Sequence, residues 1–96
     1  MSGAEMFKQA GVFRNKIISS EGFVVETGRD RLVYQENGRR MTITTELEPT
    51  GWAVALDTIA RWDDDLSRSI ASEERNRIAA NIKRALESQG YNASIF

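Results

Sequence analysis

The sequence predicts an α+β fold, in which an antiparallel meander sheet of four to six strands is covered on one face by a C-terminal helix. Three observations lead to this prediction. Hydrophobic residues recur at every second position over residues 23–56, turn residues interrupt that stretch at short intervals, and the only strong helical periodicity lies downstream, over residues 72–89. A sheet with one apolar face needs a cover, and the helix can provide it.

The chain forms one domain at most, because dividing its 96 residues would leave two undersized cores. We expect residues 1–15 to be an N-terminal segment that can be flexible, and residues 16–96 to form the single α+β domain. Lys16–Ser19 is a candidate first strand. The sequence has no long apolar run of the kind that signal peptides and membrane-spanning helices need, and it therefore predicts a cytoplasmic protein without a membrane partner.

Three turns are expected to connect the strands of residues 23–56. The Asn37-Gly38 pair predicts a type I′ hairpin, because both central positions of that turn need a positive φ, which Asn and Gly tolerate best. Gly28-Arg29 suits a type II′ turn. Residues 48–51, with a proline in second position, suit a type I turn.

These turns also predict the register of the sheet, because residues that lie opposite one another in a hairpin share a face. One apolar face and one mostly polar face result. The expected opposite pairs are Tyr34 with Met41, Leu32 with Ile43, Val25 with Leu32, Phe23 with Tyr34, Leu47 with Trp52, Thr45 with Val54, and Ile43 with Leu56.

The helix is expected to begin at Ser72, a good N-cap, with Glu73 and Glu74 in the first turn, where the helix dipole favours negative charge. Gly90 stands where a left-handed residue would end it. Residues 91–95 alternate apolar and polar side chains and predict a short returning strand. The stripe expected to face the sheet consists of Ile78, Ile82, Ala85, Leu86 and Gln89.

The composition excludes most familiar kinds of catalysis. The chain has no cysteine and no histidine, so a disulfide, a thiolate metal site and the usual general base are all missing. Its 13 basic and 14 acidic residues give a net charge of -1, so no overall basic field attracts nucleic acid. We expect no enzyme, no cofactor and no metal.

The densest acidic cluster is Asp63-Asp64-Asp65, directly after Trp62. Its spacing does not match a calcium-binding EF-hand loop. Two interpretations stay open: the carboxylates keep a connection between strand and helix solvated and form Asx turns, or they form an acidic patch that meets a basic partner. Trp62 either sits at the rim of the core or stands exposed as an interface anchor. For Trp52 we expect a core position.

Several arginines fall on turns and on the polar face of the predicted sheet. Nucleic acid is not expected to bind there, because Phe23 and Tyr34 fall on the face that the helix covers, which leaves no aromatic surface for stacking bases. We expect these arginines to pair with Glu26, Asp30 and Glu36. They are Arg14, Arg29, Arg31, Arg39 and Arg40.

Three sequence elements together resemble the immunity protein 74 family of bacterial polymorphic toxin systems, over roughly residues 17–91. They are a tyrosine-containing hairpin with paired arginines at residues 30–41, an Ile-x-x-Trp-Asp element at 59–63, and a helix that ends in Gln-Gly-Tyr at 81–91. The resemblance implies a small cytoplasmic protein that binds a cognate toxin and blocks it without chemistry.

The sequence thus predicts a non-catalytic, toxin-neutralising immunity protein. We expect Trp62, Asp63, Asp64 and Asp65 to bind the partner, because acidic side chains can enter the basic clefts of toxins that act on nucleic acid. The alternative is a small nucleic-acid or regulatory binding module that uses the arginine-bearing face of the sheet. The least favoured alternative is a hydrolase in which the three aspartates hold a divalent metal.

Overall fold

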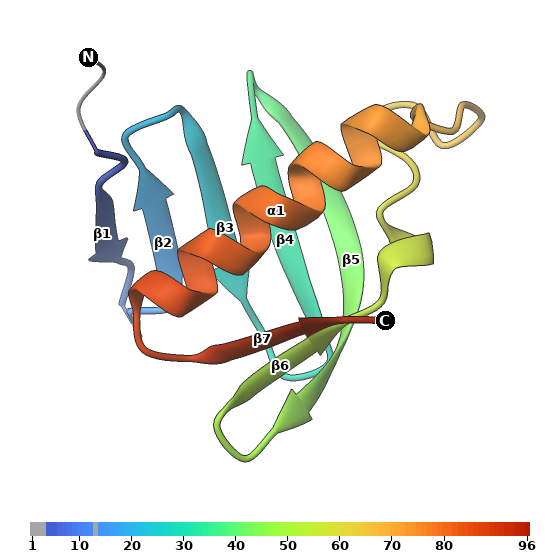
Figure 1. Cartoon of the computed structure of the whole chain (residues 1–96). Coiled ribbons are helices and arrows are strands. Elements are labelled where there is room, and N and C mark those ends of the chain that lie inside the picture. The colour runs from blue at the N-terminus through green and yellow to red at the C-terminus, as the bar shows by residue number, and fades with distance from the viewer. Residues whose placement is uncertain (1–3, 13) are drawn as a thin grey trace.

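The computed structural model describes residues 4–12 and 14–96 of the chain. Within these ranges it contains one α-helix, one short 3-10 helix and a seven-stranded sheet (Figure 1). The elements are β1 (Phe7–Ala10), β2 (Lys16–Ser19), β3 (Phe23–Thr27), β4 (Arg31–Glu36), β5 (Arg39–Glu48), β6 (Gly51–Val54), the 3-10 helix η1 (Leu56–Thr58), α1 (Ser72–Ser88) and β7 (Asn92–Ile95).

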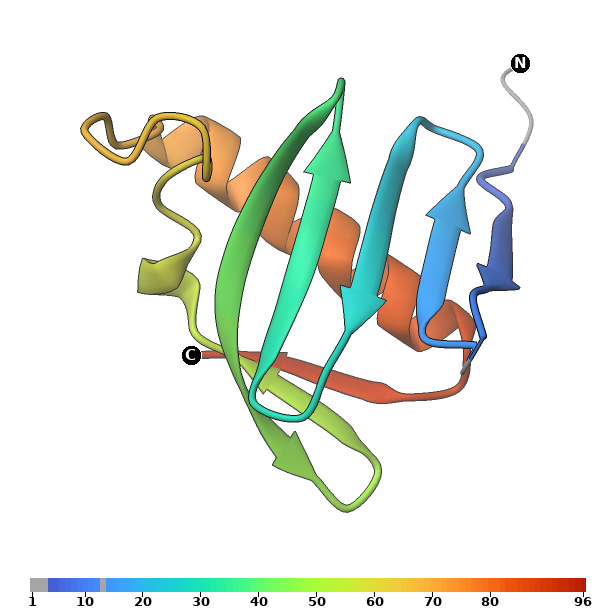
Figure 2. The same cartoon turned by 180° about the vertical axis from the view of Figure 1, so that it is seen from behind.

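The strands follow one another across the sheet in chain order, and all neighbours are antiparallel except β6 and β7. A parallel pair needs a crossover connection, which α1 supplies between β6 and β7. The sheet curls into a half-barrel with α1 across its concave face, and Figure 2 shows the outer face from behind. The α+β class, the mostly antiparallel meander and the covering helix are confirmed.

The predicted number of strands was too low, because the segment before residue 16 contributes β1. This strand pairs with β2 from Phe7↔Ser19 to Ala10↔Lys16. The sequence of β1, Phe-Lys-Gln-Ala, has one large apolar residue and no alternation of apolar and polar residues. Hydrophobic periodicity therefore does not predict a strand here. Pairing with a neighbouring strand is what makes it a strand.

The hairpin at Asn37-Gly38 is confirmed, with Tyr34 opposite Met41 and Leu32 opposite Ile43. Asn37 has a φ of 53° and Gly38 a φ of 75°, as a type I′ turn requires. The β5–β6 hairpin is confirmed at its turn, where Leu47 lies opposite Trp52.

Of the next two residue pairs predicted for β5, one forms and the other does not. Thr45 lies opposite Val54, as predicted. Ile43 does not pair with Leu56, because β6 ends at Val54 and the chain turns into η1 at Leu56.

The β3–β4 connection differs from the prediction by two residues. Val25 lies opposite Tyr34, and Thr27 lies opposite Leu32. Gly28 does not have the positive φ of a type II′ turn; its N–H instead donates to the carbonyl oxygen of Arg31 at 2.9 Å, which makes the connection longer. Because side chains alternate with a period of two, this shift leaves every residue on its predicted face.

The helix buries its predicted stripe, with Ile78, Ile82, Ala85 and Leu86 inaccessible to solvent and Gln89 half-buried. Its N-cap is Ala71, which makes no side-chain hydrogen bond, so the prediction of Ser72 as N-cap was wrong. At the other end Gly90 has a φ of 84°, and the N–H of Tyr91 donates to the carbonyl of Leu86 at 3.2 Å, which forms a Schellman motif.

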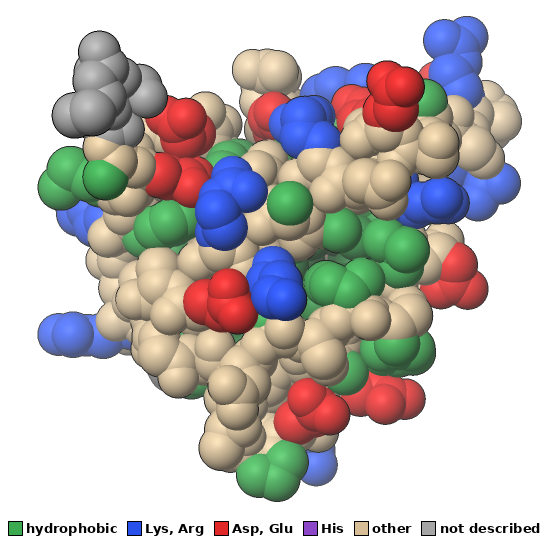
Figure 3. Space-filling model, viewed as in Figure 1, with side chains coloured by type: hydrophobic (Ala, Val, Ile, Leu, Met, Phe, Trp, Pro, Cys, Tyr) green, Lys and Arg blue, Asp and Glu red, His purple; other side chains and the backbone are tan. Residues whose placement is uncertain are grey.

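The core lies between the concave face of the sheet and α1. A row of four aromatic rings crosses it, Phe7, Phe23, Tyr34 and Trp62, with centroid distances of 6.2, 5.5 and 6.2 Å between successive rings. The exposed side of α1 carries charged side chains of both signs (Figure 3).

No helix in the described ranges is long and apolar enough to cross a bilayer.

Candidate partner-binding site

The segment that carries Trp62 and the three aspartates runs from η1 towards α1 along the edge of β5 that β4 leaves free (Figure 1). Its position is set by the backbone, since the N–H of Asp63 donates to the carbonyl oxygen of Arg40 at 2.7 Å. The aspartates therefore lie beside the β4–β5 hairpin, 20 or more residues away in the sequence. The structure thus joins two features that the sequence shows separately, the paired arginines and the acidic cluster.

Asp63 completes the hydrogen bonding of β5 with its side chain. Its Oδ1 accepts from the N–H of Thr42 at 3.2 Å, and its Oδ2 accepts from the hydroxyl of Thr42 at 3.0 Å. Two residues along, the hydroxyl oxygen of Thr58 accepts from the N–H of Thr44 at 3.0 Å. Side-chain oxygens thus take the place of a neighbouring strand along the first half of β5, so the Asp63 carboxylate has a structural task.

Asp64 forms a two-pronged ion pair with Arg39. The Nη2 of Arg39 lies 2.7 Å from Oδ1, and its Nε lies 3.2 Å from Oδ2. The hydrogen bond from Arg39 holds the pKa of the Asp64 carboxyl below its usual range. The same guanidinium lies 4.9 Å from the centre of the Trp62 ring, in cation–π contact.

Asp65 begins a tight polar turn. Its Oδ1 accepts from the hydroxyl of Ser67 at 2.8 Å, and its Oδ2 lies 3.8 Å from the Nε of Arg68. The donor from Ser67 is its side-chain hydroxyl and not its backbone N–H, so this contact is not the Asx turn of the first interpretation. The carboxylate is half-buried and still faces solvent on one side.

Trp62 is a core residue, with only 6% of its surface exposed. It packs against Tyr34 and under Arg39, so the alternative in which it stands exposed as an interface anchor was wrong. Trp62 is the last ring in the aromatic row of the core, and it packs against the Arg39 guanidinium that pairs with Asp64.

A cleft of about 320 Å³ opens beside this pair, at the start of α1. Two arginines and two carboxylates line it, together with small and apolar residues. Arg68 and Glu74 belong to this surface and were missed by the sequence argument, because nothing local in their sequence links them to the hairpin. The lining residues are Arg39, Trp62, Asp65, Arg68, Ser69, Ile70, Ala71 and Glu74.

Of the predicted arginine pairs, only that of Arg31 with Asp30 forms within the described ranges, with a long N–O distance of 4.0 Å. Glu36 pairs with Arg77 of the helix instead, at 2.8 Å. Arg31 and Arg40 line a shallow hollow on the outer face of the sheet, but the aromatic rings of Phe23 and Tyr34 lie buried on the other face. That arrangement offers nucleic acid no stacking surface from those two rings.

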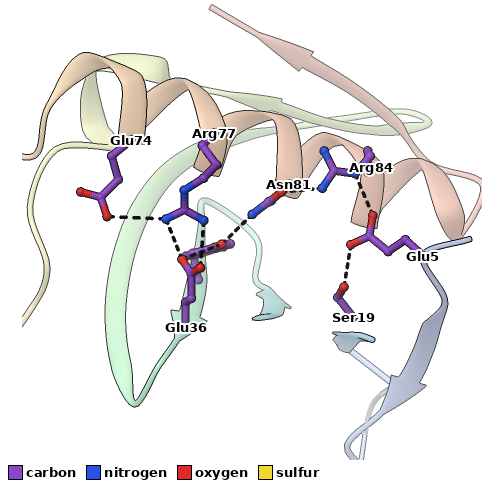
Figure 4. A network of polar contacts seen from close by, with 8 residues as sticks. Glu5, Ser19, Glu36, Glu74, Arg77, Asn81 and Arg84 are labelled. Carbon is purple, nitrogen blue, oxygen red and sulfur yellow. Dashed lines mark hydrogen bonds and ion pairs between the residues drawn. The ribbon is translucent and has the colours of Figure 1, made fainter. Parts of the chain in front are cut away.

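A polar network links one flank of α1 to the sheet (Figure 4). The Nδ2 of Asn81 donates to the Tyr34 hydroxyl oxygen at 2.9 Å, and this hydroxyl donates to Glu36 at 3.1 Å. Arg84 joins the network to Glu5, whose other oxygen accepts from Ser19 at 2.6 Å. Burial is the main reason why the pKa of Tyr34 is raised to about 12, so its hydroxyl stays protonated and holds sheet and helix together.

Among the described residues, no three acidic side chains are grouped so that they could hold a metal ion. The candidate site is a charged, hydrogen-bonded surface. It can recognise a partner through complementary charge and shape.

Comparison with known proteins shows the family of the chain. The family model described as immunity protein 74 matches residues 24–95, which include the hairpin, the Trp62 segment and α1. No curated protein and no solved structure matches the chain. Since the match spans well over half of the sequence, the chain belongs to the immunity protein 74 family.

Proposed function

We propose that this protein is a non-catalytic immunity protein that binds a cognate bacterial toxin and occludes it. The observation that carries the proposal is its membership of the immunity protein 74 family over residues 24–95. Occlusion requires a rigid surface and no reacting group, and a chain without histidine or cysteine is suited to it.

The surface proposed to face the toxin is formed by Asp63, Asp64 and Asp65, with Trp62 as its support. Asp64 is more than half exposed although it is paired with Arg39. The hydrogen bonds of Asp63 and Asp64 fix both carboxylates before any partner arrives, so little side-chain entropy is lost on binding. Charged surfaces of this kind speed up encounter and select the partner.

The test is binding to the C-terminal toxin domain encoded beside the gene of this protein, with that domain inactivated. Asp64→Lys combined with Asp65→Lys leaves Asp63 in its structural place and reverses two charges. We expect the dissociation constant to rise at least tenfold, and co-expression to stop protecting cells from the active toxin. Asp57→Lys, in η1, is the matched control and should bind like the wild type.

Two results would contradict the proposal in different ways. A wild-type protein that neither binds the toxin domain nor protects cells would refute the immunity function itself. Binding that is unchanged in the double variant would keep the function but remove the aspartates from the interface.

A further inference from the structure

The β5–β6 hairpin carries an apolar hollow of about 160 Å³ at the far end of β5 from the aspartates. At about 30 Å³ for each water molecule, the hollow holds roughly five waters, or one large side chain. We call it the aromatic groove. Its lining residues are Leu47, Glu48, Pro49, Thr50, Gly51, Trp52 and Tyr91. Figure 3 shows an exposed hydrophobic side chain at the lower tip of the molecule, where Figure 1 places this hairpin.

Leu47 is the residue of the groove that the fold does not explain. Met41, Ile43 and Thr45 alternate along the inner face of β5, and all three are buried. Leu47 is next in this series, yet it is 58% exposed, because the hairpin extends past the elements that cover the rest of the strand. Because no other element covers the Leu47 side chain, its apolar character adds little to the core of this fold.

The walls of the groove are fixed. The indole N–H of Trp52 donates to the carbonyl oxygen of Gly28 at 3.0 Å. The Tyr91 ring meets the Trp52 ring edge to face at 4.9 Å, and the backbone of Tyr91 is held by the Schellman motif that ends α1. Rigid aromatic side chains in a partly desolvated hollow are typical of the residues that supply most of the affinity at interfaces.

The charges beside the groove indicate which chemistry it accepts. Among the described residues, Glu48 is the only charged one in the lining of the groove. Its side chain is exposed, and no basic side chain in the described part of the chain lies within 4.0 Å of it, whereas Asp64 has such a partner. A cation on the partner would therefore meet a carboxylate that is not already paired.

We propose that the aromatic groove anchors one large apolar side chain of the toxin, next to a lysine or arginine that meets Glu48. The inference rests on the proposed function, because it takes the toxin as the partner. It adds a second contact that supplies affinity, whereas the aspartate surface supplies charge.

The experiment measures binding of the inactivated toxin domain to two groove variants. Leu47→Thr keeps a residue that suits a strand and removes the apolar side chain, and Glu48→Lys reverses the charge. We expect each to raise the dissociation constant at least tenfold without changing the melting temperature by more than a few degrees. The matched controls are Ile18→Thr, an exposed aliphatic residue of β2, and Glu21→Lys in the β2–β3 turn.

A second measurement does not depend on a variant. The two tryptophan indole N–H signals in an NMR spectrum can be assigned by substituting each residue in turn. On addition of the toxin domain, the Trp52 signal should shift strongly, because its ring forms a wall of the groove.

The outcomes separate the groove from the proposed function. If the wild type binds the toxin domain while both groove variants bind within twofold of it and the Trp52 signal stays in place, the groove proposal is overturned and the immunity function stands. If Leu47→Thr instead abolishes self-association seen by sedimentation, the occupant is a second copy and the proposal is also overturned. A wild type that does not bind the toxin domain refutes both.

Discussion

Neighbouring aspartates in this protein have different tasks, although they are chemically identical. Asp63 directs its carboxylate at Thr42 of β5 and completes the edge of the sheet, while Asp64 pairs with Arg39 and stays more than half exposed. A substitution at Asp63 therefore acts on stability, and one at Asp64 acts on the charge of the surface. Changing all three at once would mix the two effects.

Asp63→Ala should lower the free energy of unfolding by about 1–2 kcal/mol, because it removes two hydrogen bonds from β5. Asp63→Asn should have a smaller effect, since its amide oxygen can still accept from the N–H of Thr42. Urea denaturation measures both, and Asp57→Ala serves as control, with an expected change within about 0.5 kcal/mol. Equal stability of the alanine and wild-type proteins would show that the Asp63 carboxylate does not stabilise this edge.

The raised pKa of Tyr34 predicts how stability depends on alkaline pH. Burial raises this pKa to about 12 in the folded protein, above the ordinary value of 10.0, so between these values the folded state holds a proton that the unfolded state loses. The contribution of Tyr34 is complete below pH 10 and is lost as pH rises towards 12, with a slope of up to about 1.4 kcal/mol per pH unit.

Tyr34→Phe removes this slope and leaves Asn81 without one of its partners, which should lower stability at pH 8 by about 1–3 kcal/mol. Urea denaturation of both proteins from pH 8 to pH 11.5 checks this. The difference between wild type and variant should shrink as pH rises. A constant difference would mean that the hydroxyl does not titrate differently in the folded state.

At the scale of elements, the side chain of Glu5, two residues before β1, adds contacts to the pairing of β1 with β2. Glu5 accepts from Arg84 of α1 at 2.8 Å and from Ser19 of β2 at 2.6 Å. Burial acts to raise the pKa of Glu5, but the hydrogen bonds from Arg84 and Ser19 outweigh it and the pKa is lowered. The anchor is therefore complete above the ordinary Glu pKa of 4.5 and is lost only as pH falls below it.

Glu5→Gln should loosen β1 while leaving the core intact. We expect amide hydrogen exchange of β1 to become about five times faster at neutral pH, which corresponds to about 1 kcal/mol of local opening, and exchange in β4 and α1 to stay the same. Glu21→Gln, in the exposed β2–β3 turn, is the control. Unchanged exchange in β1 would show that backbone pairing alone holds this strand.

At the scale of the whole molecule, the sequence predicts the fold where a local rule is strong. The alternation of residues 23–56 and the Asn37-Gly38 pair lead directly to β3, β4, β5 and their shared face, and the Ile78 to Leu86 stripe leads to α1. Local sequence rules predict neither β1 nor the conformation of the β3–β4 connection. The first is a strand only through its neighbour, and the second depends on a hydrogen bond from Gly28 to Arg31 rather than on a two-residue turn.

The candidate site could be predicted only in part, for a similar reason. Asp63, Asp64 and Asp65 stand together in the sequence, so their clustering is visible, but their bonds to Arg39 and Thr42 span more than 20 residues. The burial of Trp62 also depends on a distant residue, Tyr34. Local patterns show which residues are present, and the fold decides which of them remain free to meet a partner.

The closed edge of β5 also limits how a partner can approach. A strand with free amide groups invites another strand to extend the sheet, which is a common route to peptide binding and to aggregation. Along the first half of β5, Thr58 and Asp63 already accept from the amides of Thr44 and Thr42, so no foreign strand can join there without displacing them. A partner on this side must therefore be recognised through its side chains, which differ between proteins, rather than through its backbone, which is the same in all of them.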